Sequence, residues 1–189
     1  MNQSLSRHLS PALLIAALAA PAGAQTSGPT TPADSFVVPA PVGFVNDFAH
    51  VLTPADKAAL TRVIEEVRTK CRAEIAVVTL ASLKGASAAD AARRIGNTWG
   101  VGPNGPPNDP TARTGAVVLL APADHQYRLE LADGARFITN DAAHQLLDAE
   151  MVPPLRHHAY GQALRRTVQA VAQRYADHFG FTLAADARQ

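Results

Sequence analysis

The sequence has little of what many proteins use to reinforce a fold or to bind polyanions. It contains a single cysteine, Cys71, in 189 residues, which excludes an internal disulfide. Charge is scarce and balanced, with 17 basic and 16 acidic residues and no basic cluster, which argues against nucleic-acid binding. The hydrophobic core must therefore be stable without disulfide bonds. We expect Cys71 to be either a small buried hydrophobe or a surface thiol that pairs between chains.

Long apolar runs are also missing, except at the amino terminus, where one predicts an export signal. Arg7 precedes an apolar run from Leu9 to Ala20, which is shorter than the about 20 residues of a membrane-spanning helix. Ala22-Gly23-Ala24 has the pattern of a cleavage site, so residues 1–24 are predicted to be a signal peptide cut after Ala24. An uncleaved anchor is the alternative. Removing residues 1–24 from the 189 leaves 165, with 16 basic and 16 acidic side chains, and no later segment predicts a membrane span. We expect a periplasmic or secreted protein.

Composition sets the expected boundaries of the folded domain. Residues 25–41 are rich in Pro, Thr, Ser and Ala, which predicts a disordered linker. A single domain is predicted over residues 42–180, and residues 181–189 are predicted to be a frayed tail.

Apolar periodicity within the domain predicts alternating helices and strands. The unbroken apolar run 116–121 is typical of a strand buried on both faces. Residues 127–131 alternate apolar and polar side chains and follow a short turn, which predicts an antiparallel hairpin with 116–121. A further strand is predicted over 75–80. Helices are predicted from Pro54 to about residue 71, from Ser87 to Trp99, from 140 to a stop at Pro153-Pro154, and from Tyr160 to Gly180.

The order of these elements predicts an α/β fold. Because a helix connects strand 75–80 to strand 116–121, the two strands should be parallel with a right-handed crossover. Helices on both faces then give a three-layer α/β/α sandwich around a small mixed sheet, with one parallel crossover and one antiparallel hairpin. The Gly- and Pro-rich residues 100–114 form either a lid or a disordered loop, in which Asn104, Asn108 and Asp109 offer oxygen ligands.

Several segments, in this order, resemble the TPM domain family over about residues 43–178. They are Val45-Asn46-Asp47-Phe48-Ala49-His50-Val51-Leu52-Thr53, Glu74-Ile75-Ala76-Val77-Val78-Thr79, Trp99-Gly100-Val101-Gly102, the strand from Gly115 with Asp124 behind it, and Glu150-Met151-Val152-Pro153 through Tyr160.

The resemblance implies an α/β/α sandwich and, in some members, acid phosphatase activity or calcium binding. Members include exported bacterial proteins and thylakoid-lumen proteins of photosystem II repair. The sequence departs from the family pattern at three places. Thr114-Gly115 stands where Asn-Gly is usual, Asp124-His125-Gln126 stands for Asp-Asp-Arg, and Arg136 replaces an acid.

Four aspartates are the candidate metal ligands: Asp47, Asp109, Asp124 and Asp141. Calcium prefers several carboxylate oxygens, so these four could form a reduced site. Asp47 and Asp124 are also the candidate nucleophiles of a phosphatase, although Asp47 could instead cap a turn.

Arg136 and Arg128 are candidate clamps for an anion. A cation at Arg136 would disfavour a metal ion nearby, since two unit charges at 4 Å interact by about 4 kcal/mol at an effective dielectric near 20. The seven histidines show no zinc spacing and are interpreted as solvated.

The function class is therefore left between two alternatives. The first is an exported binding or envelope-maintenance module whose partner is an envelope protein or a peptide. The second is a metal-assisted acid phosphatase that acts on phosphomonoesters, so the sequence leaves open whether the protein is an enzyme.

Overall fold

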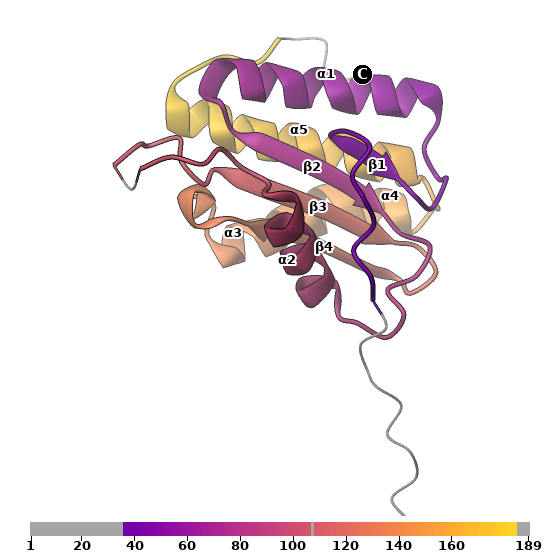
Figure 1. The fold of residues 1–189 in the computed structure, drawn as a ribbon. Helices are drawn as coiled ribbons and strands as arrows, with labels where there is room; N and C mark the ends of the chain where they lie inside the picture. Colours follow the sequence, from indigo (N-terminus) through magenta and orange to yellow (C-terminus); the bar gives the residue numbers. More distant parts are fainter. Residues whose placement is uncertain (1–35, 107, 185–189) are drawn as a thin grey trace, which may run out of the picture. The chain divides into compact units, whose positions relative to one another are not determined.

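The computed structural model describes residues 36–106 and 108–184 (Figure 1). The predicted signal peptide, linker residues 25–35 and tail residues 185–189 lie outside the described residues. The elements are β1 (Val45–Asp47), α1 (Pro54–Cys71), β2 (Glu74–Thr79), α2 (Ala88–Trp99), β3 (Gly115–Ala121), β4 (Gln126–Leu131), the 3₁₀ turn η1 (Asp133–Ala135), α3 (Asn140–Leu146), the π-helical turn η2 (Leu147–Met151), α4 (Val152–Leu155) and α5 (Tyr160–Phe179).

One mixed sheet of four strands, in the order β1-β2-β3-β4, forms the middle layer. β1, β2 and β3 are parallel, with Val77 opposite both Val45 and Val118. β4 returns antiparallel to β3, with Tyr127 opposite Leu120. The predicted α/β fold, its parallel crossover and its hairpin are confirmed. β1 was not predicted as a strand, because three residues are too few to display an alternating pattern.

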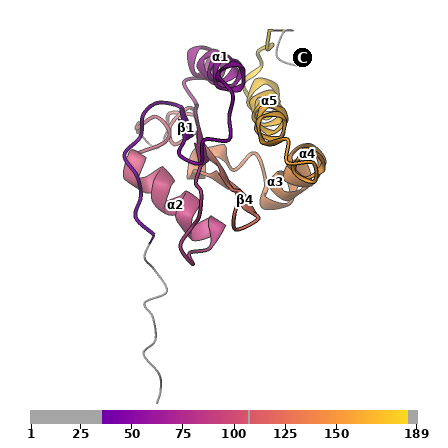
Figure 2. The same cartoon turned by 90° about the vertical axis from the view of Figure 1, so that its right-hand side faces the viewer.

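Helices cover both faces of the sheet and create two apolar layers (Figure 2). α1 and α5 pack with α3 on one face, where the core includes Ile64, Val118 and Leu164. α2 covers the other face, where Ile95 and Leu119 are buried. Every residue of β3 is buried, which agrees with its prediction as the central strand.

Local sequence explains where the helices begin and end. The Thr53 hydroxyl accepts from the Asp56 amide while the Asp56 carboxylate accepts from the Thr53 amide, a capping box at the start of α1. The stop predicted at Pro153-Pro154 is wrong by one turn. Both prolines lie inside α4, at positions whose missing N–H groups cost little because a helical turn begins there.

The folded domain extends beyond both predicted boundaries. Phe36 is buried, so the predicted disorder of residues 36–41 is corrected. Trp99 Nε1 donates to the Pro39 carbonyl at 2.8 Å and holds this segment against α2. At the other end, Phe181 and Leu183 pack against the core, so residues 181–184 are not frayed.

The 100–114 loop is tied to the sheet rather than disordered in its described residues. The Gly102 amide donates to Glu74 Oε2 at 2.9 Å, and the Arg113 amide donates to the Pro103 carbonyl at 2.8 Å. Cys71 is buried and its Sγ lies 3.3 Å from the Val67 carbonyl, so it packs as a small hydrophobe. Of the described helices, none is both long and apolar enough to cross a membrane.

Candidate functional site

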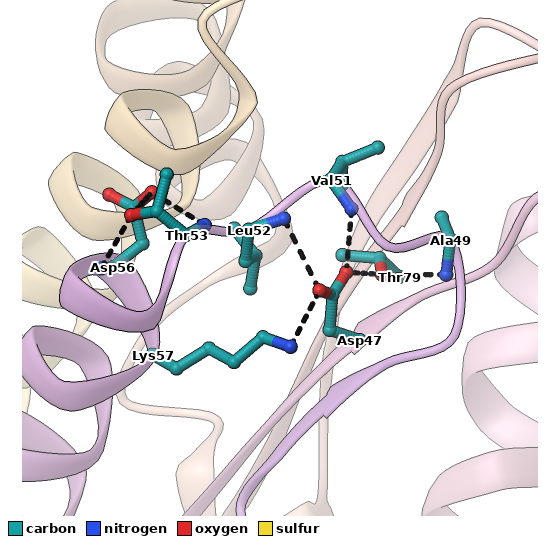
Figure 3. Close-up of polar contacts among 8 residues, drawn as sticks. All are labelled: Asp47, Ala49, Val51, Leu52, Thr53, Asp56, Lys57 and Thr79. Carbon is teal, nitrogen blue, oxygen red and sulfur yellow. Dashed lines mark hydrogen bonds and ion pairs between the residues drawn. The ribbon is translucent and has the colours of Figure 1, made fainter.

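Asp47 ends β1 and directs its carboxylate toward the start of α1 (Figure 3). Only 2% of its side chain is exposed. Oδ1 accepts from the Thr79 hydroxyl at 2.7 Å and from the Val51 amide at 3.0 Å. Oδ2 accepts from the Leu52 amide at 3.2 Å and lies 2.9 Å from Lys57 Nζ. Four donors therefore surround one buried carboxylate.

These contacts favour a structural role for Asp47. Burial alone raises the pKa of its carboxyl, but the hydrogen bonds from Thr79, Lys57 and two backbone amides outweigh burial and hold the pKa below its usual value. Both oxygens are occupied by donors of the protein itself, which leaves poor access for a metal ion or a phosphorus atom. The geometry favours the turn-capping interpretation of Asp47 over the nucleophile and the metal ligand.

Asp124 also serves a structural purpose, in the turn between β3 and β4. Its Oδ1 accepts from the Ser82 hydroxyl at 3.1 Å, and its Oδ2 accepts from the Leu83 amide. Asp124 therefore fastens the hairpin to the loop between β2 and α2. It is not fully buried, but both of its oxygens are already hydrogen-bonded.

Asp47 and Asp124 share one edge of the sheet but lie toward opposite faces. Both follow the carboxyl ends of parallel strands, which meet at the same edge. Asp47 bonds to Thr79, which points to the same face as Val77 in the α1 and α5 core. Asp124 bonds to Leu83, which packs in the α2 core. The two carboxylates therefore bond to segments that pack on opposite sides of the sheet.

The other two candidate metal ligands lie toward the opposite edge. Asp109 belongs to the α2–β3 loop, where the Thr111 hydroxyl and amide hold the pKa of its carboxyl below its usual value. Asp141 is exposed in the first turn of α3, where the helix dipole favours an anion. Within residues 36–106 and 108–184, no three His, Cys, Asp or Glu side chains gather to hold a metal ion.

The predicted set therefore does not fit calcium, which takes about six to eight oxygen ligands. The four aspartates are divided between two edges, and the two at one edge are divided between faces. Calcium binding stays a prediction of the family resemblance, and no chemical step is assigned to it.

The two candidate anion clamps are already paired with acids. Arg136 bonds to Asp133 through Nε at 3.0 Å and Nη2 at 2.7 Å. Arg128 bonds to Glu130 through Nε at 3.0 Å and Nη2 at 2.9 Å. Arg136 follows η1 and lines neither of the cavities described below. Arg128 lines one of them.

That cavity is a cleft of about 430 Å³ at the outer edge of β4, called here the wide cleft. Its lining residues are Ala88, His125, Gln126, Tyr127, Arg128, His144, Leu147 and Asp148. Successive strand side chains point to opposite faces, and both Tyr127 and Arg128 line the cleft, so it wraps around the strand edge. α2 supplies one wall, and α3 with η2 supplies the other.

A second cavity of about 250 Å³ adjoins the first and is called here the narrow pocket. It lies between the β3–β4 turn and the α4–α5 connection. It is lined by Leu120, Pro122, His125, Tyr127, Val152, Leu155, Arg156, His158 and Tyr160. His125 and Tyr127 line both cavities, so the two are neighbours around one hairpin end.

Sequence reasoning missed these cavities because it treated the histidines only as possible zinc ligands. His125, His144 and His158 are exposed, yet each lines a cavity. One signal was available: His125 and Tyr127 follow the carboxyl end of the central strand, where open α/β sheets commonly bind ligands. α3 and α4 line the cavities only because the chain folds back onto β4, and no pattern in their own sequences indicates this.

The fold and its cavities define a small α/β/α domain with two adjoining ligand-sized hollows beside its hairpin. The family model described as the TPM domain matches residues 45–174. The chain therefore belongs to the TPM domain family, as the sequence resemblance predicted.

Solved bacterial structures share this fold. The N-terminal domain of a protein from P. gingivalis is 24% identical, with a TM-score of 0.65, covering 75% of this chain and 87% of that one. The N-terminal domain of cg2496 protein from Corynebacterium glutamicum is 15% identical, with a TM-score of 0.54, covering 82% and 93%. BA42 protein from Bizionia argentinensis is 16% identical, with a TM-score of 0.54, covering 72% and 88%. At these identities the likeness shows the fold alone, and no curated protein matches this chain.

Proposed function

We propose that this TPM-domain protein is exported, cleaved after Ala24, and acts in the periplasm as a binding or envelope-maintenance module. Its ligand in this proposal is a peptide or an exposed segment of an envelope protein. The observation that carries the proposal is the contrast between two kinds of site. The candidate catalytic carboxylates, Asp47 and Asp124, already accept hydrogen bonds that stabilise the fold. The two cavities, in contrast, are open and are lined by polar and apolar side chains.

The wide cleft has the mixed chemistry that recognises a polypeptide. His125, His144 and Asp148 offer hydrogen-bonding groups of both kinds, and Leu147 and Ala88 offer apolar surface. Small binding sites of this type use an apolar lining for affinity and a few polar groups for orientation.

Two random peptide libraries displayed on phage, one with free peptide C-termini and one with free N-termini, test the binding role. Selection on the mature protein should return peptides whose binding is lost in His144→Glu. Gln145→Glu is the matched control, since Gln145 is the exposed neighbour of His144 and lines neither cavity. Retention of binding in Gln145→Glu and loss in His144→Glu supports the module. Selected peptides that ignore both substitutions, or no selected peptide at all, would reject a binding role for the cleft.

Export has its own test. The protein recovered from the periplasmic fraction of a bacterial host should have a mass that begins at Gln25. A full-length mass in the membrane fraction would favour the uncleaved anchor instead.

Phosphomonoester hydrolysis is the second candidate, and one observation favours it. The wide cleft gathers Arg128 with two histidines, His125 and His144, and side chains of these types can hold a phosphoryl group and transfer protons. Release of phosphate from a generic aryl phosphate, with and without millimolar calcium, tests this candidate. Activity that disappears in Arg128→Gln would support it. Equal background rates for wild type, Arg128→Gln and Asp124→Asn would remove it.

A further inference from the structure

The narrow pocket has an apolar floor and a positively charged rim. Leu120, Pro122, Val152 and Leu155 supply the apolar surface. Arg156 lies at the end of α4 and is exposed, so its fixed positive charge stands at the rim. The pocket therefore joins an apolar hollow to a cation, a combination that selects an apolar group next to an anion.

The lining of the pocket contains no competing negative charge. None of the described residues that line it is acidic. This distinguishes the pocket from the wide cleft, where Asp148 is present, and from Arg128 and Arg136, whose guanidinium groups pair with Glu130 and Asp133. An anion that enters the narrow pocket would therefore meet Arg156 without having to displace a carboxylate of the lining.

The rim is also positioned by local contacts. His158 Nδ1 lies 3.1 Å from the Tyr160 hydroxyl, and the two rings meet edge to face at 6.0 Å. His158 has a left-handed backbone, with φ of 55°, which turns the chain from α4 into α5. These contacts hold the His158 imidazole against Tyr160, in the same pocket lining as Arg156.

The size and continuity of the cavities indicate the length of the ligand. A volume of about 250 Å³ suits one large apolar side chain with its adjoining polar group. Because His125 and Tyr127 line both cavities, a longer ligand that fills the narrow pocket continues directly into the wide cleft. A peptide has both properties when its last residue occupies the narrow pocket.

We propose that the narrow pocket binds the C-terminal residue of a peptide, with a large apolar side chain on the floor and the α-carboxylate at Arg156 and His158. This inference rests on the proposed binding function and specifies its ligand. The preceding residues of the peptide then lie in the wide cleft, near His144 and Asp148.

A free carboxylate on an apolar last residue is the feature to test. The probe is acetyl-Gly-Ser-Gly-Ser-Phe with a free C-terminus, titrated into the mature protein and followed by calorimetry and by amide chemical shifts. We expect binding that weakens at least tenfold when the C-terminus is amidated, and at least tenfold when the last residue is Gly. Acetyl-phenylalanine alone should bind at least tenfold more weakly than the pentapeptide, because it does not reach the wide cleft.

Variants assign the effect to the rim. Arg156→Gln should weaken binding of the free acid at least tenfold and leave the weak binding of the amide unchanged. Arg174→Gln is the matched control, since Arg174 is an exposed arginine of α5 that lines neither cavity. Unchanged melting temperatures would show that neither substitution acts through folding.

The possible outcomes separate this inference from the broader function. Equal binding of acid and amide would overturn carboxylate recognition. Equal binding of acetyl-phenylalanine and the pentapeptide would overturn the proposal that the ligand is a peptide. A small apolar carboxylate would then be the ligand. No binding of any probe at millimolar concentration, combined with library peptides that still depend on His144, would reject the C-terminal mode and leave the binding module intact.

Discussion

Asp47 connects three segments that are distant in the sequence. Its carboxylate joins the end of β1 to Thr79 in β2 and to Lys57 in α1, and the Ala49 amide completes the group by donating to Thr79 Oγ1 at 3.2 Å (Figure 3). The chain leaves the sheet after β1 in an irregular turn whose amides need acceptors, since unpaired buried N–H groups are costly. One buried carboxylate supplies two of these acceptors and one ion pair.

Replacing Asp47 by Asn should destabilise the protein. The substitution removes the negative charge opposite Lys57 and turns one acceptor into a donor that faces other donors. Charge-assisted hydrogen bonds contribute about 1.5–3 kcal/mol each, so we expect the free energy of unfolding to fall by about 2–4 kcal/mol in urea titration. Asp141→Asn, at an exposed position, should change it by less than about 1 kcal/mol. Equal effects of the two substitutions would contradict the role of Asp47.

The same carboxylate predicts a pH dependence. The folded-state pKa of Asp47 is lowered, so its stabilising contribution is present above the unfolded pKa of about 3.9 and is lost as the pH falls through the lower folded value. The difference in unfolding free energy between wild type and Asp47→Asn should therefore be constant near neutral pH and shrink below about pH 4. Urea midpoints of both proteins from pH 7 to pH 2 measure it. A difference that persists unchanged at the acid end would show that charge is not its source.

At the scale of single elements, β3 begins where the α2–β3 loop passes directly over the chain. A Cβ atom on Gly115 would overlap the Val101 carbonyl oxygen and stand 2.6 Å from the Val101 carbonyl carbon. Gly102, next in the loop, has φ of 110°, which favours glycine at that position as well. Close backbone approach, rather than chain flexibility, explains why a glycine opens the central strand.

Gly115→Ala should therefore cost more stability than a glycine substitution in the helix that packs on the same strand. Overpacking against backbone atoms costs about 1–3 kcal/mol or more, and thermal unfolding should report a loss in the upper part of that range. Gly96→Ala in α2 is the control, because its Cβ would lie 3.4 Å from a Val117 methyl group, an ordinary contact. Gain of helix propensity offsets that contact, so Gly96→Ala should change stability by less than about 1 kcal/mol. A Gly115→Ala protein as stable as Gly96→Ala would refute the close approach.

The connection from α3 to α5 shows how an element can depart from a sequence rule. Pro153 and Pro154 predict a stop, because proline breaks a continuing helix. The chain instead widens into η2 before the prolines and starts a new turn with them. Met151, at the end of η2, is completely buried, and the turn that follows supplies Val152 and Leu155 to the narrow pocket.

For the whole molecule, the sequence predicted what depends on local periodicity and missed what depends on distant contacts. The buried strand at 116–121 and the apolar stripe of α5 were predicted because side chains repeat at the period of their element. The partners of Asp47 could not be predicted, since Thr79 lies 32 residues away and is brought near only by the pairing of β1 with β2. The cavities arise where β4 meets α2, α3 and α4, and no motif within any one of these elements predicts that they meet.

Composition misled the prediction of where the domain begins. Residues 25–41 include few large apolar side chains, which is typical of a linker. Phe36 is one of these few, and it is only 3% exposed. Its carbonyl accepts from Arg94 Nη2 at 2.7 Å, and the Arg94 guanidinium lies 5.3 Å from the Phe36 ring centroid. A single aromatic anchor and its backbone contacts are thus enough to order a segment whose average composition is that of a linker.

Phe36→Ala in the full chain should therefore destabilise a domain that was expected to start after it. Burying a large apolar side chain contributes about 1.5–3 kcal/mol, and the cavity left in the α2 core adds to the loss, so we expect about 2–4 kcal/mol in urea titration. Val37→Ala is the matched control, since Val37 is 80% exposed, and it should change stability by less than about 0.5 kcal/mol.

A chain that begins at Val42 should match Phe36→Ala or be less stable, because it also loses the bond from Trp99 to Pro39. If the shortened chain unfolds at the wild-type urea midpoint, residues 36–41 contribute nothing to the fold, and the boundary at Val42 stands.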